Sequence, residues 1–151
     1  MFKKITLAAI VCAFASSPAF AADERTEMAV ESRSGIFEVI RMYFGPVLGM
    51  VRGQVEFDAA TVEHSAKNIA SLAAMIPDGF RHNTAGTDAE TEALDAIWDD
   101  IEDFNAKAAT LVERANALAA AAPNGLDATR QAFGGVGQAC KACHDNYREQ
   151  N

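Results

Sequence analysis

The chain has 151 residues, 50% of them hydrophobic and 23% charged, and its formal net charge at pH 7 is −8. This length is typical of a single domain. The acidic balance argues against nucleic-acid binding, which requires cationic side chains to neutralise phosphates, and it favours positively charged partners.

The first 21 residues have the parts of an export signal. Lys3 and Lys4 precede an apolar run, and an Ala-Phe-Ala sequence ending at Ala21 is a typical cleavage site. The apolar run is too short to span a bilayer, and no later stretch is apolar for 18 or more consecutive residues. We therefore expect a signal peptide over residues 1–21, a mature domain over residues 22–151, a periplasmic location and no membrane span. Without the signal, 11 Lys and Arg face 21 Asp and Glu, so the net charge becomes −10.

The first two helical blocks follow the signal. Apolar residues recur at helical spacing over residues 28–52 and again over residues 59–76. Pro46 interrupts the first block and predicts a kink or a break there, because an interior proline removes one backbone hydrogen bond. Asp58 is a suitable N-cap for the second block, and Pro77-Asp78-Gly79 is expected to end it.

The third and fourth blocks are predicted as long helices as well. The third steps by three and four residues from Leu94 to Ala122, with Thr87 or Asp88 as its cap, and the fourth runs over residues 126–148. No strand-like alternation of comparable length occurs. Four amphipathic helices with short connections predict an all-α, antiparallel four-helix bundle.

The fourth block contains Cys140-Lys141-Ala142-Cys143-His144, which has the C-x-x-C-H pattern of a c-type haem attachment site. The two thiols can form thioethers with the haem vinyl groups, and the imidazole can bind the iron. All three side chains share one helix face, and both cysteines lie on the apolar seam, so the haem is expected inside the bundle. A disulfide across two residues would stabilise little.

A haem-free C-x-x-C pair is the alternative interpretation. A dithiol oxidoreductase usually places such a pair in a βαβ context, which the sequence lacks. A zinc site would need a second Cys or His pair, which is lacking too.

Two residues of the first block are candidates for the opposite side of the haem. Arg33 lies on the apolar stripe, where a charge needs a compensating group. Either a haem propionate supplies it, or the arginine extends past the seam to solvent. If Arg33 marks the haem edge, Phe37, one turn later, points over the iron.

The remaining candidates concern axial ligation. Phe37 cannot coordinate, so His144 is expected to be the only protein ligand of a five-coordinate, high-spin iron. His64 and His82 are interpreted as solvated. Arg148, one turn after His144, is either a solvated arginine favourable to the helix dipole or a cation beside the proximal face.

These residues resemble the cytochrome c′ family, the class II c-type cytochromes. The resemblance covers nearly the whole mature chain. It rests on Arg33-x-x-x-Phe37, on Ile97-Trp98, and on the segment Gly137-x-x-Cys140-Lys141-Ala142-Cys143-His144-Asp145-x-Tyr147-Arg148. Phe44-Gly45 and Val51-Arg52-Gly53 add weaker support, whereas Pro46 departs from the family pattern.

The resemblance implies up-down-up-down topology and one covalent haem c. It implies that Cys140 and Cys143 hold the haem, that His144 is the axial ligand, and that Arg148 is the proximal arginine. Arg33 would lie near the propionates. Phe37 matches the position of an apolar blocking residue in high-spin members, where low-spin relatives have a methionine. The family is often homodimeric through the first two helices.

An open iron behind an apolar lid is compatible with two functions. One is binding of small gases, nitric oxide above all and also carbon monoxide, because bound dioxygen requires a hydrogen-bond donor that phenylalanine lacks. The other is electron transfer with redox partner proteins. A low-spin, six-coordinate electron carrier is the alternative. No catalytic constellation is recognised, so an enzyme is not expected.

Overall fold

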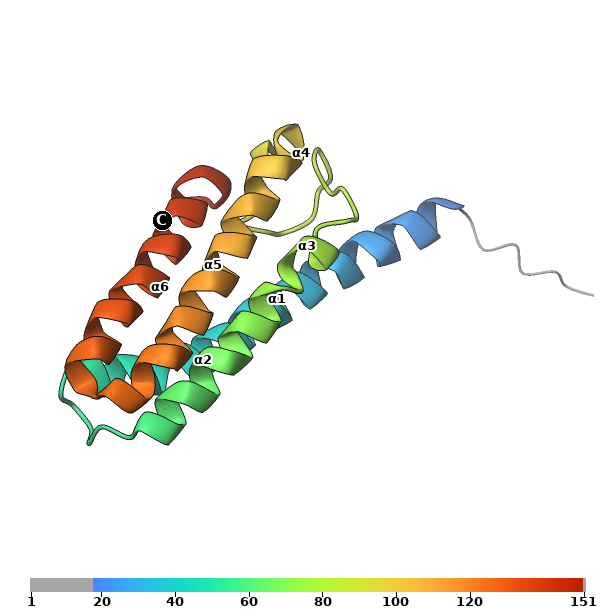
Figure 1. Ribbon diagram of the computed structural model, residues 1–151. Helices are drawn as coiled ribbons and strands as arrows, with labels where there is room; N and C mark the ends of the chain where they lie inside the picture. Colours follow the sequence, from blue (N-terminus) through green and yellow to red (C-terminus); the bar gives the residue numbers. More distant parts are fainter. Residues whose placement is uncertain (1–17, 151) are drawn as a thin grey trace, which may run out of the picture.

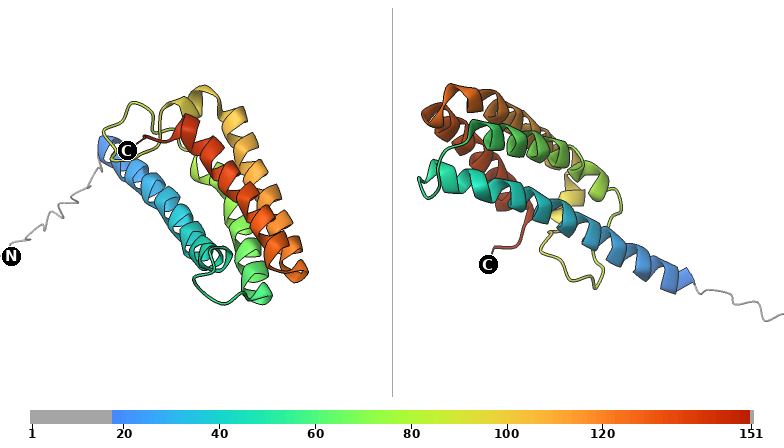
Figure 2. Two further views of the ribbon diagram at one scale, coloured as in Figure 1. Left: turned by 90° about the vertical axis from the view of Figure 1, so that its left-hand side faces the viewer. Right: turned by 90° about the horizontal axis from the view of Figure 1, so that it is seen from below.

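The computed structural model describes residues 18–150, with side chains from residue 24 onward. It has four long helices: α1 (Pro18–Val51), α2 (Ala59–Ala73), α5 (Ile101–Ala121) and α6 (Leu126–Tyr147). Three short helices connect them: α3 (Ile76–Gly79), α4 (Ala96–Asp99) and the 3-10 helix η1 (Ala122–Asn124). Successive long helices run in opposite directions (Figure 1; Figure 2). The all-α, up-down-up-down four-helix bundle is therefore confirmed.

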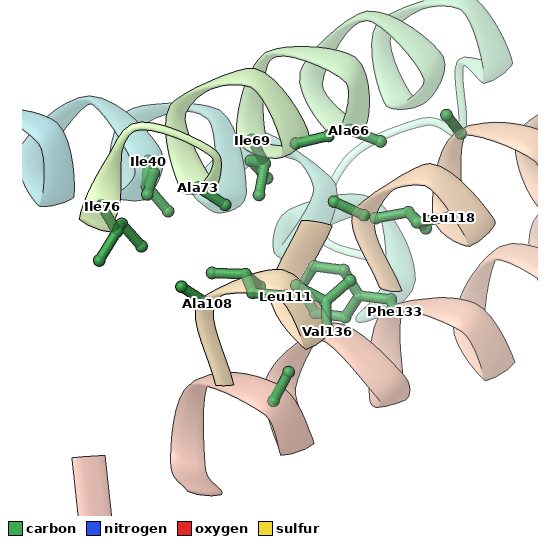
Figure 3. Packing of buried hydrophobic residues seen from close by; sticks show 14 of the residues in the cluster. Ile40, Ala66, Ile69, Ala73, Ile76, Ala108, Leu111, Leu118, Phe133 and Val136 are labelled. Carbon is green, nitrogen blue, oxygen red and sulfur yellow. The ribbon is translucent and has the colours of Figure 1, made fainter. Parts of the chain in front are cut away.

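The apolar stripes predicted from the sequence form the core (Figure 3). One seam residue from each long helix illustrates this, because Val47, Ile69, Leu118 and Val136 are all fully buried. Burial of an aliphatic side chain contributes about 1.5–3 kcal/mol relative to exposure, so these contacts are a main source of stability. Helix α5 packs extensively against both α2 and α6, whereas α1 and α6 make few contacts with each other.

Helix α1 continues through Pro46, so the predicted break is wrong. A proline cannot donate to the carbonyl one turn earlier, which belongs to Met42. Both Pro46 and Met42 are exposed, and water can therefore hydrogen-bond that carbonyl. The neighbouring Val47 is fully buried against the bundle, which holds the helix in place.

Two other predicted helix boundaries were also wrong. The segment Pro77-Asp78-Gly79 does not end the second helix but lies within the short helix α3. The third block is divided into α4 and α5 at Asp100, whose carboxylate accepts a hydrogen bond from the Asp103 amide at 3.0 Å. That side chain competes with the helix for backbone donors, and it caps α5 in place of Thr87 or Asp88. Asp58 caps α2 as predicted.

The N-terminal part of the chain bears on export. Residues 1–17, most of the predicted signal peptide, lie outside the described residues, while α1 begins within it at Pro18. By length and composition alone, the stretch Glu24–Val51 is apolar enough to cross a bilayer. The same stretch contributes Val47 and Arg33 to the interior of the bundle and packs along α2. It therefore serves as a bundle helix in this structure.

Candidate haem site

The C-x-x-C-H residues lie in the last two turns of α6, as predicted. Cys140 and Cys143 are half-buried and free, with no disulfide between them. Burial raises the pKa of both thiols above the ordinary value, so they are neutral near pH 7. Burial, followed by the nearby Arg148 guanidinium, lowers the pKa of His144. A neutral imidazole has a lone pair available for a metal.

A cavity of about 790 Å³ opens beside these three residues, between α1 and α6. Its walls also include α3, α4, α5 and the segment before α4. This volume lies within the range of about 300–1,000 Å³ that is typical of cofactor sites. Its apolar wall residues are Phe37, Ile40, Phe44, Ile76, Phe80, Ala93, Ile97, Phe104, Ala108, Leu111 and Ala139. Apolar walls suit a flat macrocycle, and the two thiols at one wall suit covalent attachment, so the residues present fit a haem.

Helix α1 forms the wall that faces α6, and Phe37 is part of it, as predicted. The ring is 38% exposed, so it is not enclosed by protein and part of it borders the cavity. Ile40 and Phe44 extend the same wall, and Phe44 packs on Phe133 with 4.4 Å between ring centroids. The wall is not purely apolar, because Ser34, Glu38 and Arg41 of α1 line the cavity as well.

Arg33 lines the cavity too, but its compensating groups come from the protein itself. It is 3% exposed and donates hydrogen bonds to the Gly79 carbonyl at 2.8 Å, the Thr84 hydroxyl at 2.8 Å and the His82 carbonyl at 2.5 Å. Its guanidinium also lies over the Phe80 ring, 4.5 Å from the centroid. Burial lowers its pKa from the ordinary value. A guanidinium has five N–H donors, so two remain for a propionate. The alternative of an arginine extended into solvent is wrong.

Arg148 borders the cavity in a conformation that the helical pattern did not indicate. Helix α6 ends at Tyr147, and Arg148 is in an extended backbone conformation (φ −129°, ψ 141°). As the C-cap of α6, its amide still donates to the His144 carbonyl at 3.2 Å. Its guanidinium forms an ion pair with Glu92 at 2.6 Å, and the side chain is 43% exposed. Glu92 was not identified from the sequence, because no short-range pattern connects it to Arg148.

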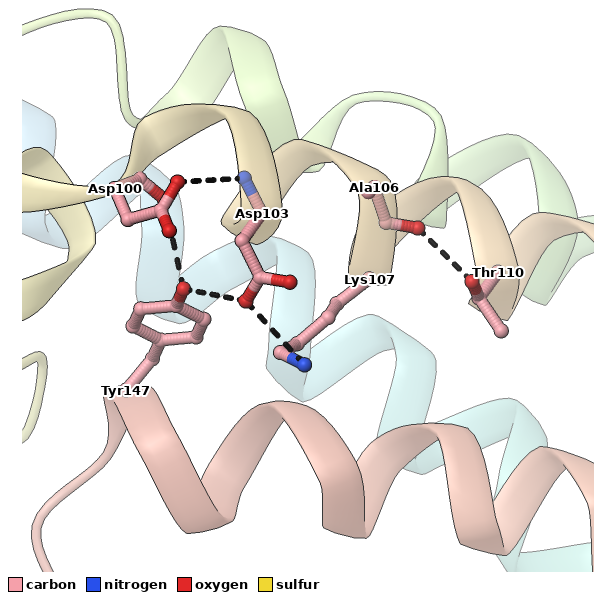
Figure 4. Close-up of polar contacts among 6 residues, drawn as sticks. All are labelled: Asp100, Asp103, Ala106, Lys107, Thr110 and Tyr147. Atoms are coloured by element: carbon pink, nitrogen blue, oxygen red, sulfur yellow. Dashed lines mark hydrogen bonds and ion pairs between the residues drawn. The ribbon is translucent and has the colours of Figure 1, made fainter.

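A polar cluster joins α5 to the last turn of α6 (Figure 4). The Tyr147 hydroxyl donates to Asp103 Oδ2 at 2.6 Å, and Lys107 Nζ lies 3.3 Å from the same oxygen. Tyr147 is buried, and its hydroxyl is hydrogen-bonded. The hydrogen bond from Tyr147 lowers the pKa of Asp103 and raises that of Tyr147. This cluster fixes the turn that carries His144.

The Tyr147–Asp103 contact predicts a pH-dependent stability. Tyr147→Phe removes the donor that lowers the Asp103 pKa, so the variant should be less stable than the wild type at pH 7. A depressed carboxyl pKa stabilises the fold above the unfolded value of about 3.9, and this contribution is lost as the pH falls through the lower folded value. The difference in unfolding free energy, from urea denaturation, should therefore be constant from pH 7 to 5 and shrink below pH 4. Phe133→Leu, whose ring packs on Phe44 and donates no hydrogen bond, is the control and should give a difference that does not depend on pH.

The other candidate ligands lie away from the cavity. His64 is exposed and contacts Asn68, and His82 lies near Thr26. Neither histidine is among the cavity residues, and no methionine is. Within residues 24–150, no group of three or more His, Cys, Asp or Glu side chains could hold a metal ion. A single imidazole holds iron only when another group supplies the remaining ligands, as a haem does.

Comparisons with known proteins agree with this geometry. The family described as Cytochrome C′ matches residues 28–148. A cytochrome c′ of Cereibacter sphaeroides is 35% identical over 97% of both chains. A solved cytochrome c′ from Rhodobacter Spheriodes has a TM-score of 0.77 and 34% identity, over 83% of this chain and 98% of that one. A nitric oxide complex of a cytochrome c prime variant from Alcaligenes xylosoxidans has a TM-score of 0.72 and 34% identity, over 83% and 97%. These matches cover most of the chain, and the cysteines and histidine of the C-x-x-C-H segment line a cavity that fits a haem. The chain therefore belongs to the cytochrome c′ family of haem c proteins.

Proposed function

We propose that the protein is an exported haem c protein with a five-coordinate, high-spin iron that binds small neutral gases, nitric oxide above all. Cys140 and Cys143 would hold the haem through thioethers, and His144 would be the axial ligand. Arg33 would lie near the propionates, and Arg148 on the His144 side. When bound, the haem supplies an iron that accepts a gas ligand and exchanges electrons.

The placement of Phe37 is the observation that carries this proposal. A phenylalanine ring borders the cavity on the wall facing α6, where a sixth ligand would have to stand. Among the described cavity residues, His144 is the one histidine, and the one amine, Lys107, pairs with Asp103. These residues therefore offer no second histidine and no methionine as an axial ligand, and one side of the iron would remain open.

The chemistry of the α1 wall favours nitric oxide over dioxygen. Dioxygen bound to ferrous iron develops negative charge and is stabilised by a hydrogen-bond donor, whereas nitric oxide and carbon monoxide bind without one. Phe37, Ile40 and Phe44 provide the apolar part of this wall, while Ser34 and Arg41 line the cavity from the same helix. Distal polarity is one of the factors that decide haem function, so preference for nitric oxide requires that neither Ser34 nor Arg41 donates a hydrogen bond to the bound gas.

Electron transfer is the second candidate function. Its support is that His144 and Arg148 are both exposed, which places an edge of the site at the surface where a redox partner can approach. The acidic net charge suits a cationic partner. Either function is that of a binding or electron-transfer protein and requires no catalytic group.

Titration of the ferrous protein with gases tests the proposal. Absorption spectra should show complexes with nitric oxide and carbon monoxide, the first formed more tightly, and no stable dioxygen complex. A stable dioxygen complex would contradict the role of the apolar wall. Absence of any gas complex would leave electron transfer by a six-coordinate iron as the function.

We also propose that the mature chain begins at Ala22, is periplasmic and forms a homodimer through α1 and α2. Val39 and Met42 support the dimer, since they are apolar and exposed on α1 and do not line the cavity. Intact mass would give the N-terminus. Sedimentation of the wild type and of Met42→Glu would test the interface, and an unchanged molecular mass for the variant would contradict it.

A further inference from the structure

The C-terminal residues form a short paired segment with the chain before α4. Leu94 N donates to the Tyr147 carbonyl at 3.0 Å, and Glu149 N donates to the Glu92 carbonyl at 2.8 Å. Ala93 and Arg148 thereby form an isolated antiparallel bridge. We call residues 147–149, paired in this way with residues 92–94, the C-terminal strap.

One ion pair reinforces the strap. Arg148 Nε and Nη2 lie 2.7 and 2.6 Å from the same oxygen, Glu92 Oε2. The two side chains are 43% and 51% exposed, so the pair is accessible to water and salt. Arg148 follows the last residue of α6, so the helix holds its backbone amide but does not determine where its guanidinium lies. Its position depends on Glu92 and on the bridge.

The strap is connected directly to the candidate axial ligand. The His144 carbonyl accepts hydrogen bonds from Arg148 N at 3.2 Å and from the Gln150 side-chain amide at 3.0 Å. Glu92, Ala93, His144 and Arg148 all line the cavity. The strap therefore joins the last turn of α6, which carries His144, to the segment before α4. Both parts border the cavity.

We propose that Glu92 is a positioning residue that, through the C-terminal strap, holds Arg148 at the cavity and fixes the orientation of His144. This inference rests on the proposed function, because it assigns His144 to the iron. Exposed ion pairs are weak, and an effect of about two- to fivefold on opening of the strap is the expected size. It should also depend on ionic strength, since salt screens exposed charges.

Amide hydrogen exchange of the holoprotein tests the strap itself. In Glu92→Gln, the Leu94 and Glu149 amides should exchange about two to five times faster than in the wild type at low salt. At high salt, the exchange rates of these amides in the wild type should approach those in Glu92→Gln. Glu56→Gln removes the same charge from an exposed residue between α1 and α2 that does not line the cavity, and it is the matched control, with unchanged exchange at both amides. Equal exchange in Glu92→Gln and the wild type would overturn the proposal.

A charge-reversed pair separates the strap from the charge of Arg148. The double variant Glu92→Arg/Arg148→Glu restores an ion pair with the signs exchanged, and it should regain slow exchange at Leu94 and Glu149. Arg148→Glu alone places two carboxylates together, so the Leu94 and Glu149 amides should exchange fastest in this variant. Failure of the double variant to recover protection would overturn the ion pair as the cause.

Resonance Raman spectroscopy of the ferrous protein tests the effect on His144. The iron–histidine stretching band should broaden or shift in Glu92→Gln and stay unchanged in Glu56→Gln. Faster exchange with an unchanged band would overturn the positioning role and leave a purely structural strap. Absence of an iron–histidine band in the wild type would instead contradict the proposed ligation, while the exchange data would still decide whether the strap exists.

Discussion

His144→Ala is expected to abolish normal iron ligation while Cys140 and Cys143 keep the haem attached. The imidazole is the one histidine side chain among the described cavity residues, so the iron would lose the axial ligand proposed for it. Absorption and EPR spectra of the ferric variant should differ from the wild type throughout, whereas the mass of the covalent haem protein should change only by the substitution. This is the largest spectroscopic effect expected from one side chain.

His64→Ala is the matched control for this experiment. His64 is exposed on α2 and is not a cavity residue, so its removal should leave the spectra unchanged. Unchanged spectra for His144→Ala would refute the ligand assignment. Changed spectra for His64→Ala would show that a histidine outside the cavity reaches the iron.

Phe37→Ala should raise the carbon monoxide affinity of the ferrous protein by about tenfold or more, which corresponds to 1.4 kcal/mol. The ring borders the cavity from the α1 wall, and its removal opens space for a ligand on that side. Because the new methyl group is apolar as well, dioxygen binding should gain no hydrogen bond. Carbon monoxide titration followed by absorption measures the change.

Val39→Ala is the control for Phe37→Ala. Val39 has almost the same exposure, 37% against 38%, and lies on the same helix, but it is not a cavity residue. Its substitution should not change the affinity. If Phe37→Ala binds carbon monoxide no more tightly than Val39→Ala, Phe37 is not the lid of the site.

The parts of the structure that follow from local pattern could be predicted from the sequence. Helical spacing identified the four long helices, because seam residues such as Ile69 and Leu118 must be buried together. The register of Cys140 and Cys143 on the α6 seam placed the attachment site inside the bundle. Phe37 followed from one helical turn after Arg33, and it does border the cavity.

The partners of charged and polar groups could not be predicted, because they come from distant parts of the chain. Arg33 is bonded across 46 to 51 residues, to Gly79, His82 and Thr84. Glu92 reaches Arg148 across 56 residues. No periodicity in the sequence encodes such contacts, since they depend on how the connecting segments fold over the bundle.

Local signals also gave wrong boundaries where tertiary contacts compete with them. Pro46 predicted a break, yet the burial of Val47 keeps α1 continuous. The apolar spacing after Leu94 predicted one helix, yet the Asp100 cap divides it into α4 and α5. In both cases the residues with apolar spacing, such as Val47 and Phe104, are buried, and the error concerned only where a helix is continuous.

The spin state of the ferric protein tests the central claim most directly. With His144 as the only protein ligand and Phe37 on the open side, the EPR spectrum should show high-spin iron, and resonance Raman should give five-coordinate marker bands. A low-spin, six-coordinate spectrum would contradict the account, because a second axial ligand would then stand where the structure places Phe37.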